Sequence, residues 1–272
     1  MKKTSRFFLG ILGLILGILW IFPFYMILTN SFKTPKGIFA SVLSLPGNGQ
    51  ATTANYHNSF KALDFISSLG HSLLITVVSV LILVLFSSMA AYALQRNKSK
   101  LSGAILMLFV SAMLIPFQTV MIPLTANFGQ VHMLNMWGLM FMYLGFDASL
   151  SIFLYQGTMG SIPIAMDESA ELEGANRFQI FFKIIFPMLT PITVTVGILN
   201  IIAIWNDYLL PSLVLPQNQY TIPLQMFFFF GQYTKQWHLA LAGLTLSIIP
   251  VILFYIFAQR YIIKGVTDGA VK

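Results

Sequence analysis

Residues 73–86 read LLITVVSVLILVLF, and this stretch decides the fold class of the chain. Apolar side chains occur at every register, so the stretch lacks both the alternation of a half-buried strand and the single stripe of a surface helix. The alternating period of a membrane barrel is absent for the same reason. The uncharged run around it exceeds the roughly 20 residues with which a helix crosses a bilayer. The stretch therefore predicts a transmembrane helix.

Similar uncharged runs recur along the chain. The six predicted transmembrane helices lie at about 7–30, 68–94, 103–126, 134–157, 187–209 and 239–262. Each must be helical, because a backbone N–H or C=O group left unpaired in hydrocarbon costs several kcal/mol. We predict an all-α, polytopic membrane protein in which residues 1–272 form a single transmembrane domain.

Composition supports this class and excludes several others. The 272 residues are 57% hydrophobic and 8% charged, whereas ordinary globular chains are about 25% charged. The absence of cysteine excludes disulfides, thiolate metal sites and cysteine nucleophiles. The four histidines are scattered at no ligand spacing and come without clustered acids, so we predict neither a metal site nor a cofactor.

The basic residues indicate the orientation in the membrane. With the N-terminus inside, eleven Lys and Arg residues fall in inner segments: Lys2, Lys3, Arg6, Arg96, Lys98, Lys100, Arg177, Lys183, Arg260, Lys264 and Lys272. Four fall in outer segments: Lys33, Lys36, Lys61 and Lys235. This asymmetry is typical of cytoplasmic termini. The net charge of +7 therefore reflects orientation and gives no reason to expect a nucleic-acid partner.

One stretch crowds charge between apolar runs: residues 161–187, SIPIAMDESAELEGANRFQIFFKIIFP. It belongs to the connection of about 158–186, which we call the polar loop. Four acids fall within seven positions of it: Asp167, Glu168, Glu171 and Glu173. A plain solvated connector in a helical bundle needs only about two to eight residues. The length and charge of the polar loop favour a structured element that meets another protein.

Its sequence predicts a helix, a turn and a second helix along the inner membrane face. Ser161 is placed to cap the first helix, and Pro163 suits its first turn. Gly174 offers a left-handed break, Arg177 begins the second helix, and Pro187 marks the start of the next transmembrane run.

The polar loop resembles a known motif. It contains Glu168-Ser169-Ala170, then Gly174-Ala175, then Ile184-x-Phe186-Pro187. This resembles the "EAA" loop of permease subunits of ABC importers. The chain departs from that pattern at Ser169, Glu173 and Phe186, where Ala, Asp and Leu are usual.

Fragments along nearly the whole chain are similar to the carbohydrate-uptake branch of these permeases, of the maltose-permease second-subunit type. They are Ser31-Phe32-Lys33, Ala91-Tyr92-Ala93-Leu94 with Arg96, Ile115-Pro116, Ile122-Pro123, Trp205-Asn206-Asp207-Tyr208 and the tail 265–272. His71, where relatives usually have Asn, and Asp147 are departures from the branch.

The resemblance implies the fold of type I ABC-importer permeases in a bacterial cytoplasmic membrane. It implies a second homologous permease subunit, a dimer of cytoplasmic ABC ATPases, an extracytoplasmic solute-binding protein and a sugar substrate. The residues implied to couple to the ATPase are Glu168, Ser169, Ala170, Gly174, Ala175, Ile184 and Pro187. The chain has no G-x-x-x-x-G-K-[ST] phosphate loop, so it is expected to be a transport subunit whose partner hydrolyses ATP.

Asp147 is the most unusual polar residue of the predicted membrane helices. A carboxylate near mid-membrane costs about 2.5–3.5 kcal/mol on insertion scales, so Asp147 is expected to face the substrate pathway or a partner. Asn127 and Tyr143 are candidates to join it, with Asn206 and Asp207 at the outer end of the fifth helix. Structural alternatives stay open: Asp147 caps a break after Gly145 or pairs with the partner permease, and the 206–207 pair caps a helix.

These observations favour an importer permease for an oligosaccharide or a glycoside. A glycerol-phosphate importer is the nearest alternative, because relatives of this branch resemble one another whichever they carry. An ion-coupled secondary transporter that uses Asp147 as a relay is the competing class.

Overall fold

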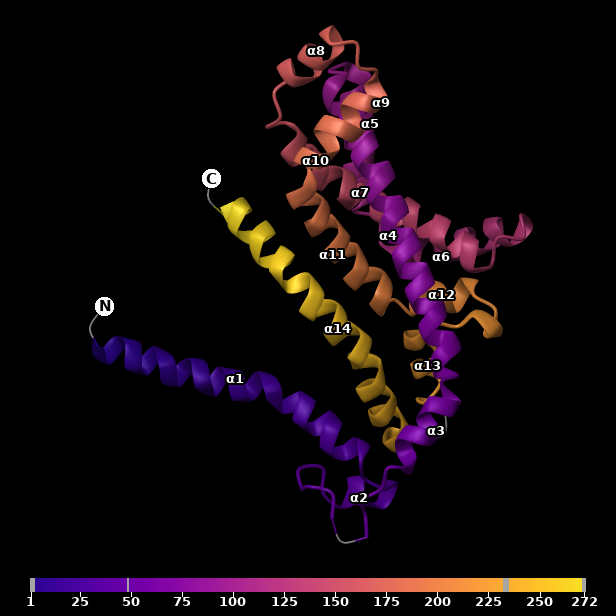
Figure 1. Ribbon diagram of the computed structural model, residues 1–272. Coiled ribbons are helices and arrows are strands. Elements are labelled where there is room, and N and C mark those ends of the chain that lie inside the picture. The colour runs from indigo at the N-terminus through magenta and orange to yellow at the C-terminus, as the bar shows by residue number, and fades with distance from the viewer. Residues whose placement is uncertain (1–2, 48, 232–234, 271–272) are drawn as a thin grey trace. The chain divides into compact units, whose positions relative to one another are not determined.

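The computed structural model describes residues 3–47, 49–231 and 235–270, and every regular element in these ranges is helical (Figure 1). The chain forms two compact units. The first comprises Met1–Ile66 and Gln225–Phe254, and the second comprises Ser67–Leu224 and Tyr255–Lys272. The predicted all-α class is confirmed. Of the tail at 265–272, Val271 and Lys272 lie outside the described residues.

Four helices are long and apolar enough to cross a membrane without interruption. They are the segment Leu9–Ser31 of α1 (Lys3–Ser31), α4 (Phe65–Arg96), α7 (Met136–Met159) and the segment Trp237–Ile256 of α14 (Trp237–Ala270). Two bent helix pairs raise the number to six if each pair is one span. All six correspond to the predicted runs.

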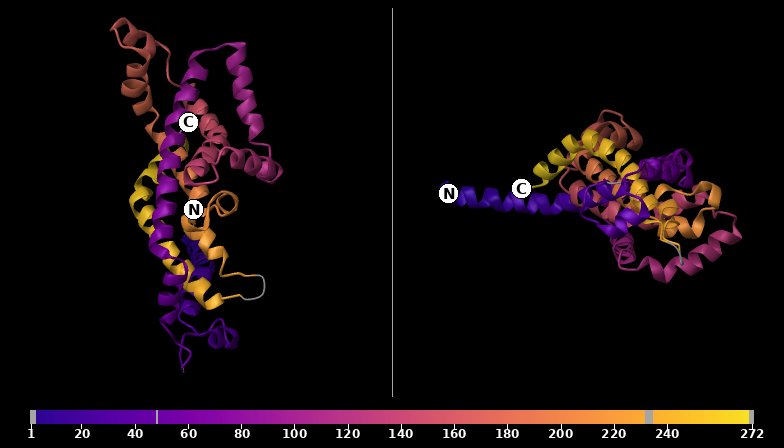
Figure 2. Two further views of the ribbon diagram at one scale, coloured as in Figure 1. Left: turned by 90° about the vertical axis from the view of Figure 1, so that its right-hand side faces the viewer. Right: turned by 90° about the horizontal axis from the view of Figure 1, so that it is seen from below.

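The bent pairs differ from the straight spans that the sequence predicts. Helices α5 (Lys100–Ala112) and α6 (Phe117–Gln130) meet at 102° (Figure 2). Pro116 stands at the break with extended backbone, and a proline has no N–H to continue the helix and disfavours helical backbone in the residue before it. The fifth run is also bent, by 78°, where Arg177–Met188 meets α11 (Thr190–Asn206).

The core of the second unit gathers around α4 and α7. With 32 residues, α4 is about 48 Å long, which exceeds the roughly 30 Å of bilayer hydrocarbon. Helix α7 packs on α5, α11 and α12 (Leu209–Val214). Side chains with no more than 2% exposure mark this core: Ile75, Leu83, Leu139, Met140, Met142, Ile152, Tyr155, Met159, Ile180, Ile185, Leu189, Val196 and Val214.

The segment after α12 is tied to the second unit by two side chains. It contains a short turn at Gln217–Gln219 and begins α13 (Ile222–Phe227). The Gln219 side chain accepts a hydrogen bond from the Met136 amide at 2.9 Å, and the Ser72 hydroxyl accepts one from the Ile222 amide at 2.9 Å. The proline-rich stretch after the fifth span is therefore ordered against α4 and α7.

In the first unit, hydrogen bonds to the Ser31-Phe32-Lys33 fragment connect α1 with α2 (Pro35–Ala40) and α3 (Ala54–Ala62). The Lys33 side chain is 1% exposed, and its Nζ donates to Asn30 Oδ1 at 3.0 Å and to the Ser41 carbonyl at 2.9 Å. Burial lowers the pKa of this ammonium group. Asn55 Nδ2 donates to the carbonyls of residues 31 and 33.

Candidate functional site

The polar loop begins with helix α8 (Ala165–Leu172), which has two distinct faces. Asp167 and Ala170 are buried, whereas Glu168, Ser169, Glu171 and Leu172 are exposed. Asp167 and Glu168 lie in the first turn, where a carboxylate meets the positive end of the helix dipole. The exposed face is free, within this chain, to meet a partner.

The predicted cap at Ser161 is wrong. Helix α8 starts at Ala165, with Ile164 at its N-cap and no side-chain cap. The Ser161 hydroxyl instead donates to the Thr158 carbonyl at 2.7 Å, so it completes the end of α7. A serine can form a local hydrogen bond at either end of a helix, and residues 162–164 separate Ser161 from the start of α8.

Gly174 ends α8 as predicted, with φ at +86°. The Ala175 amide donates to the Ala170 carbonyl and the Gly174 amide donates to the Glu171 carbonyl, each at 3.0 Å. These two bonds form a Schellman motif, in which a glycine in the left-handed region closes a helix and a small apolar contact joins its flanks. The motif explains why alanines stand at 170 and 175 on either side of the glycine.

A second short helical run leads from the turn to the membrane helices. Helix α9 (Arg177–Ile180) starts with a capping box between Asn176 and Gln179, and continues through a π-helical turn, Phe181–Ile185, and α10 (Phe186–Met188). The predicted start of this run at Arg177 is confirmed. Ile184 packs against the core, and Pro187 is exposed just before the 78° bend into α11.

Leu172 is a site feature that sequence reasoning missed. Its side chain is 91% exposed at the last turn of α8. Single exposed apolar residues are common on protein surfaces, so it is the position of Leu172 beside Glu168 and Glu171 on the exposed face of α8 that makes it a candidate contact residue. The signal in the sequence was one leucine between Glu171 and Glu173.

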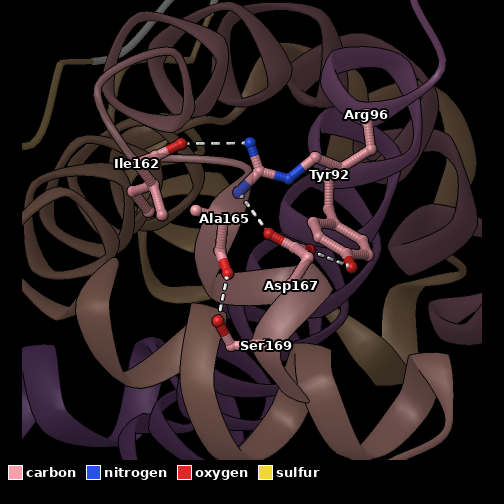
Figure 3. A network of polar contacts seen from close by, with 6 residues as sticks. All are labelled: Tyr92, Arg96, Ile162, Ala165, Asp167 and Ser169. Carbon is pink, nitrogen blue, oxygen red and sulfur yellow. Dashed lines mark hydrogen bonds and ion pairs between the residues drawn. The ribbon is translucent and has the colours of Figure 1, made fainter. Parts of the chain in front are cut away.

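The sequence also gave no sign of a buried ion pair beneath α8 (Figure 3). Arg96, the last residue of α4, places Nη2 2.7 Å from Asp167 Oδ2 and donates from Nη1 to the Ile162 carbonyl at 3.1 Å. Tyr92 donates its hydroxyl proton to Asp167 Oδ1 at 2.6 Å, across 75 positions of the chain. The Arg96 guanidinium lies 5.8 Å from the centre of the Tyr92 ring. We call these four residues the latch.

A hollow of about 770 Å³ opens beside the latch. Its charged lining residues are Arg96, Asp167, Glu168, Glu171 and Arg177. Acidic and basic groups therefore share this wall, between the end of α4 and the helices α8 and α9 (Figure 1).

A second hollow, of about 430 Å³, lies between α7 and the end of α11. It brings together four of the five predicted pathway residues: Tyr143, Asp147, Asn206 and Asp207. Phe117 and Phe146 also line it, and no Lys, Arg or His from the described part of the chain does.

Asp207 is held at both of its carboxylate oxygens. The Tyr143 hydroxyl donates to Oδ2 at 2.9 Å, and the Leu209 amide donates to Oδ1 at 2.9 Å, at the start of α12. Asn206 donates to the Ile202 carbonyl within α11. The expected capping role of residue 207 thus coexists with a place on the wall of the hollow.

The structure excludes one alternative for Asp147 and separates Asn127 from it. Helix α7 continues through Gly145, so the alternative in which Asp147 caps a break there is wrong. Asn127 lies in a separate hollow of about 460 Å³, which Phe128 and Phe141 also line. The structure therefore does not bring Asn127 to Asp147. Among the residues described, no three His, Asp or Glu side chains are grouped so as to hold a metal ion.

Comparisons with known proteins agree with this architecture. Residues 83–268 match the family described as the binding-protein-dependent transport system inner membrane component. The chain is 51% identical over 275 aligned residues, covering 100% of both chains, to the probable starch degradation products transport system permease protein AmyC of Thermoanaerobacterium thermosulfurigenes. It is 34% identical, over 100% of this chain and 99% of the other, to the multiple sugar-binding transport system permease protein MsmG of Streptococcus mutans.

The fold is also found in a solved structure. A chain of a bacterial ABC transporter involved in the import of the acidic polysaccharide alginate superposes with a TM-score of 0.75 at 23% identity, over 96% of this chain and 98% of the other. The whole-length sequence identities and the family match agree with the apolar helices described above. The chain therefore belongs to the family of binding-protein-dependent transport system inner membrane components, as a multi-pass protein of the cell membrane.

Proposed function

We propose that this chain is a permease subunit of an ATP-driven importer of neutral oligosaccharides, of the kind released by starch breakdown. The observation that carries this proposal is the 51% identity, over the full length of both chains, to a permease named for starch degradation products. Residues 1–272 would act as one transmembrane domain, with both termini in the cytoplasm, as the inward excess of Lys and Arg indicates.

The polar loop would dock on a cytoplasmic ATPase. Support comes from the exposed face of α8, on which the Glu168 carboxylate and the apolar Leu172 side chain are accessible to a partner. The Schellman turn at Gly174 gives this helix a fixed end. Movement of α8 when the ATPases close would pass through Ile184 and Pro187 into α11. Such a shift between two packed states gives alternating access.

The other partners follow from the family and from what this chain lacks. The sequence has no phosphate-binding loop of the G-x-x-x-x-G-K-[ST] type, so a dimer of ABC ATPases would hydrolyse the ATP. The family description names dependence on a binding protein, which would deliver the sugar from outside. A second permease subunit would complete the pathway.

The hollow at Tyr143, Asp147 and Asp207 would form this chain's part of the sugar pathway. Carboxylate oxygens accept hydrogen bonds from sugar hydroxyls, and the Phe117 and Phe146 rings offer apolar surface to the faces of a sugar. Among the residues that the structure describes, no cationic side chain lines the hollow to pair with a phosphate, and like charges repel more strongly away from bulk water. The lining therefore favours a neutral sugar over glycerol phosphate. Asn127 remains a predicted contributor, from its separate hollow.

The test is reconstitution of this chain with its co-purifying partners in lipid discs. ATP hydrolysis is measured with the binding protein and, in turn, maltotriose, raffinose or glycerol 3-phosphate. We expect stimulation by maltotriose that depends on the binding protein. Stimulation by glycerol 3-phosphate alone would replace the proposed substrate class. If no ATPase co-purifies, and the chain reconstituted in sealed vesicles takes up sugar in response to an ion gradient, the ABC-importer proposal is wrong and Asp147 becomes the candidate ion relay.

A further inference from the structure

We propose that the latch makes the end of α4 and the helix α8 move as one body, so that α4 carries ATPase movement into the membrane alongside α11. This inference rests on the proposed function of the polar loop. Arg96 and Asp167 are positioning residues in it: they touch neither sugar nor nucleotide, and they act by holding α8 at a fixed place on α4.

The contacts of the latch join two segments that are far apart in the sequence. Arg96 reaches both the Asp167 carboxylate, at 2.7 Å, and the Ile162 carbonyl, at 3.1 Å. The two contacts bracket the entry to α8 (Figure 3). Tyr92 holds the other carboxylate oxygen at 2.6 Å and packs its ring 5.4 Å from that of Phe181, in the run that follows α9. One turn of α4 therefore holds both arms of the polar loop.

Because the ion pair is buried, each of its charges requires the other at a fixed place. The side chains of Arg96 and Asp167 are 14% and 10% exposed. At such sites a lone charge is costly, so either partner alone is unfavourable while the pair is tolerated. The Arg96 Nε atom is buried and has no hydrogen-bond partner in the described part of the chain. A buried ion pair contributes little net stability, because the cost of desolvation offsets the attraction between the charges, which favours a role in fixing where α8 stands.

Helix α4 is suited to carry a movement onward. The Gln156 side chain of α7 donates to the Ala91 carbonyl at 3.2 Å, one residue before Tyr92, so α7 is joined to the same turn. The covalent path from α8 to α11, by contrast, runs through a π-helical turn and a 78° bend. The latch gives α8 a direct connection to α4 that avoids both features.

The first experiment compares Arg96→Gln and Asp167→Asn with Lys98→Gln in the complete complex in lipid discs. Lys98 is exposed two residues beyond the latch, and serves as the matched control. The readout is the ratio of ATP hydrolysis with maltotriose-loaded binding protein to hydrolysis without it, together with co-purification of the ATPase. We expect both latch variants to keep the ATPase bound and to lose the stimulation, and the control to keep the wild-type ratio. A wild-type ratio in both latch variants would overturn the proposal.

A second experiment separates the latch from misfolding. The chain has no cysteine, so Arg96→Cys with Asp167→Cys provides a unique pair for a short bis-maleimide linker. Before linking, we expect the stimulation to be lost; after linking, verified by the mobility of this chain on a gel, we expect it to return, because the linker restores the connection between α4 and α8. A misfolded chain would neither bring down the ATPase nor recover the stimulation. Fully linked protein that brings down the ATPase and remains unstimulated would show that the two helices must move apart, and would overturn the proposal.

Failure of the proposed function would look different from failure of the latch alone. If the proposed function is wrong, the wild-type chain itself will bring down no ATPase or show no stimulation by any sugar, and the latch proposal is then wrong as well. A stimulated wild type beside unaffected latch variants would refute the latch and leave the importer standing.

Discussion

The Tyr143 hydroxyl lies 2.9 Å from Oδ2 of Asp207 and joins α7 to the turn between α11 and α12. The second oxygen of the same carboxylate accepts the Leu209 amide proton at 2.9 Å. Asp207 is thus fixed before any ligand arrives, and lone pairs left on its two oxygens can face the hollow. A pre-oriented acceptor is what a pathway for sugar hydroxyls requires, because little ordering remains to be done on binding.

Tyr143→Phe tests this arrangement. The substitution keeps the ring and removes one of the two hydrogen bonds to Asp207; a hydrogen bond to a charged group contributes about 1.5–3 kcal/mol. We expect a lower midpoint of thermal unfolding in detergent and reduced uptake. The control is Tyr25→Phe, whose hydroxyl donates to the Leu43 carbonyl at 2.9 Å at an exposed place. Equal changes in the two variants would contradict a special role for the hollow.

Asp147→Asn tests the carboxylate inside α7. An amide accepts weaker hydrogen bonds than a carboxylate, so we expect uptake of a neutral oligosaccharide to fall by about tenfold, which corresponds to about 1.4 kcal/mol. Asn127→Ala, in the separate hollow, is expected to reduce uptake less. Uptake is measured with radiolabelled maltotriose at matched membrane levels. Unchanged uptake by Asp147→Asn would remove this residue from the pathway.

Much of the fold follows from local features of the sequence. An uncharged run is recognised from the residues of one segment alone. The six predicted runs match the four uninterrupted helices and the two bent pairs. The left-handed break at Gly174 and the start at Arg177 are equally local, because turn chemistry needs only neighbouring residues.

The features that the sequence did not indicate are of two kinds. Some depend on contacts between residues far apart in the chain, and others depend on which of two nearby helix ends a side chain bonds to. The bend at Pro116 could not be predicted from hydropathy, because hydropathy measures how apolar a run is and does not show where the helix axis changes direction. Pairing of Arg96 with Asp167 requires two elements to meet in space, and either charge alone fits a solvated surface. Ser161 had two helix ends within reach and bonds to the earlier one. The exposure of Leu172 depends on which way α8 turns against its neighbours, which the local sequence does not determine.

Gly138→Ala is expected to destabilise the start of α7. A Cβ built at Gly138 collides with the carbonyl of Met133, which is backbone and cannot swing away as a side chain can. The Asn135 side chain holds this turn through the amides of Trp137 and Gly138, so the clash also strains the cap. Gly145→Ala on the same helix meets nothing within 4 Å and is the control. Folded yield and thermal unfolding in detergent are the measurements; equal values for both variants would contradict the clash.

Gly174→Ala is expected to abolish most uptake while leaving membrane insertion intact. The substitution places a side chain at φ +86°, and left-handed backbone costs about 1–2 kcal/mol for residues other than glycine. The strain acts on the Schellman bonds from residues 174 and 175, which set the orientation of α8 and of its exposed Glu168. Gly49→Ala is the matched control, since Gly49 has φ +76° and open space around it, like Gly174. Uptake and co-purification of the ATPase are measured for both. If the two variants lose uptake equally, the strain acts through general instability and the polar loop has no special part in coupling.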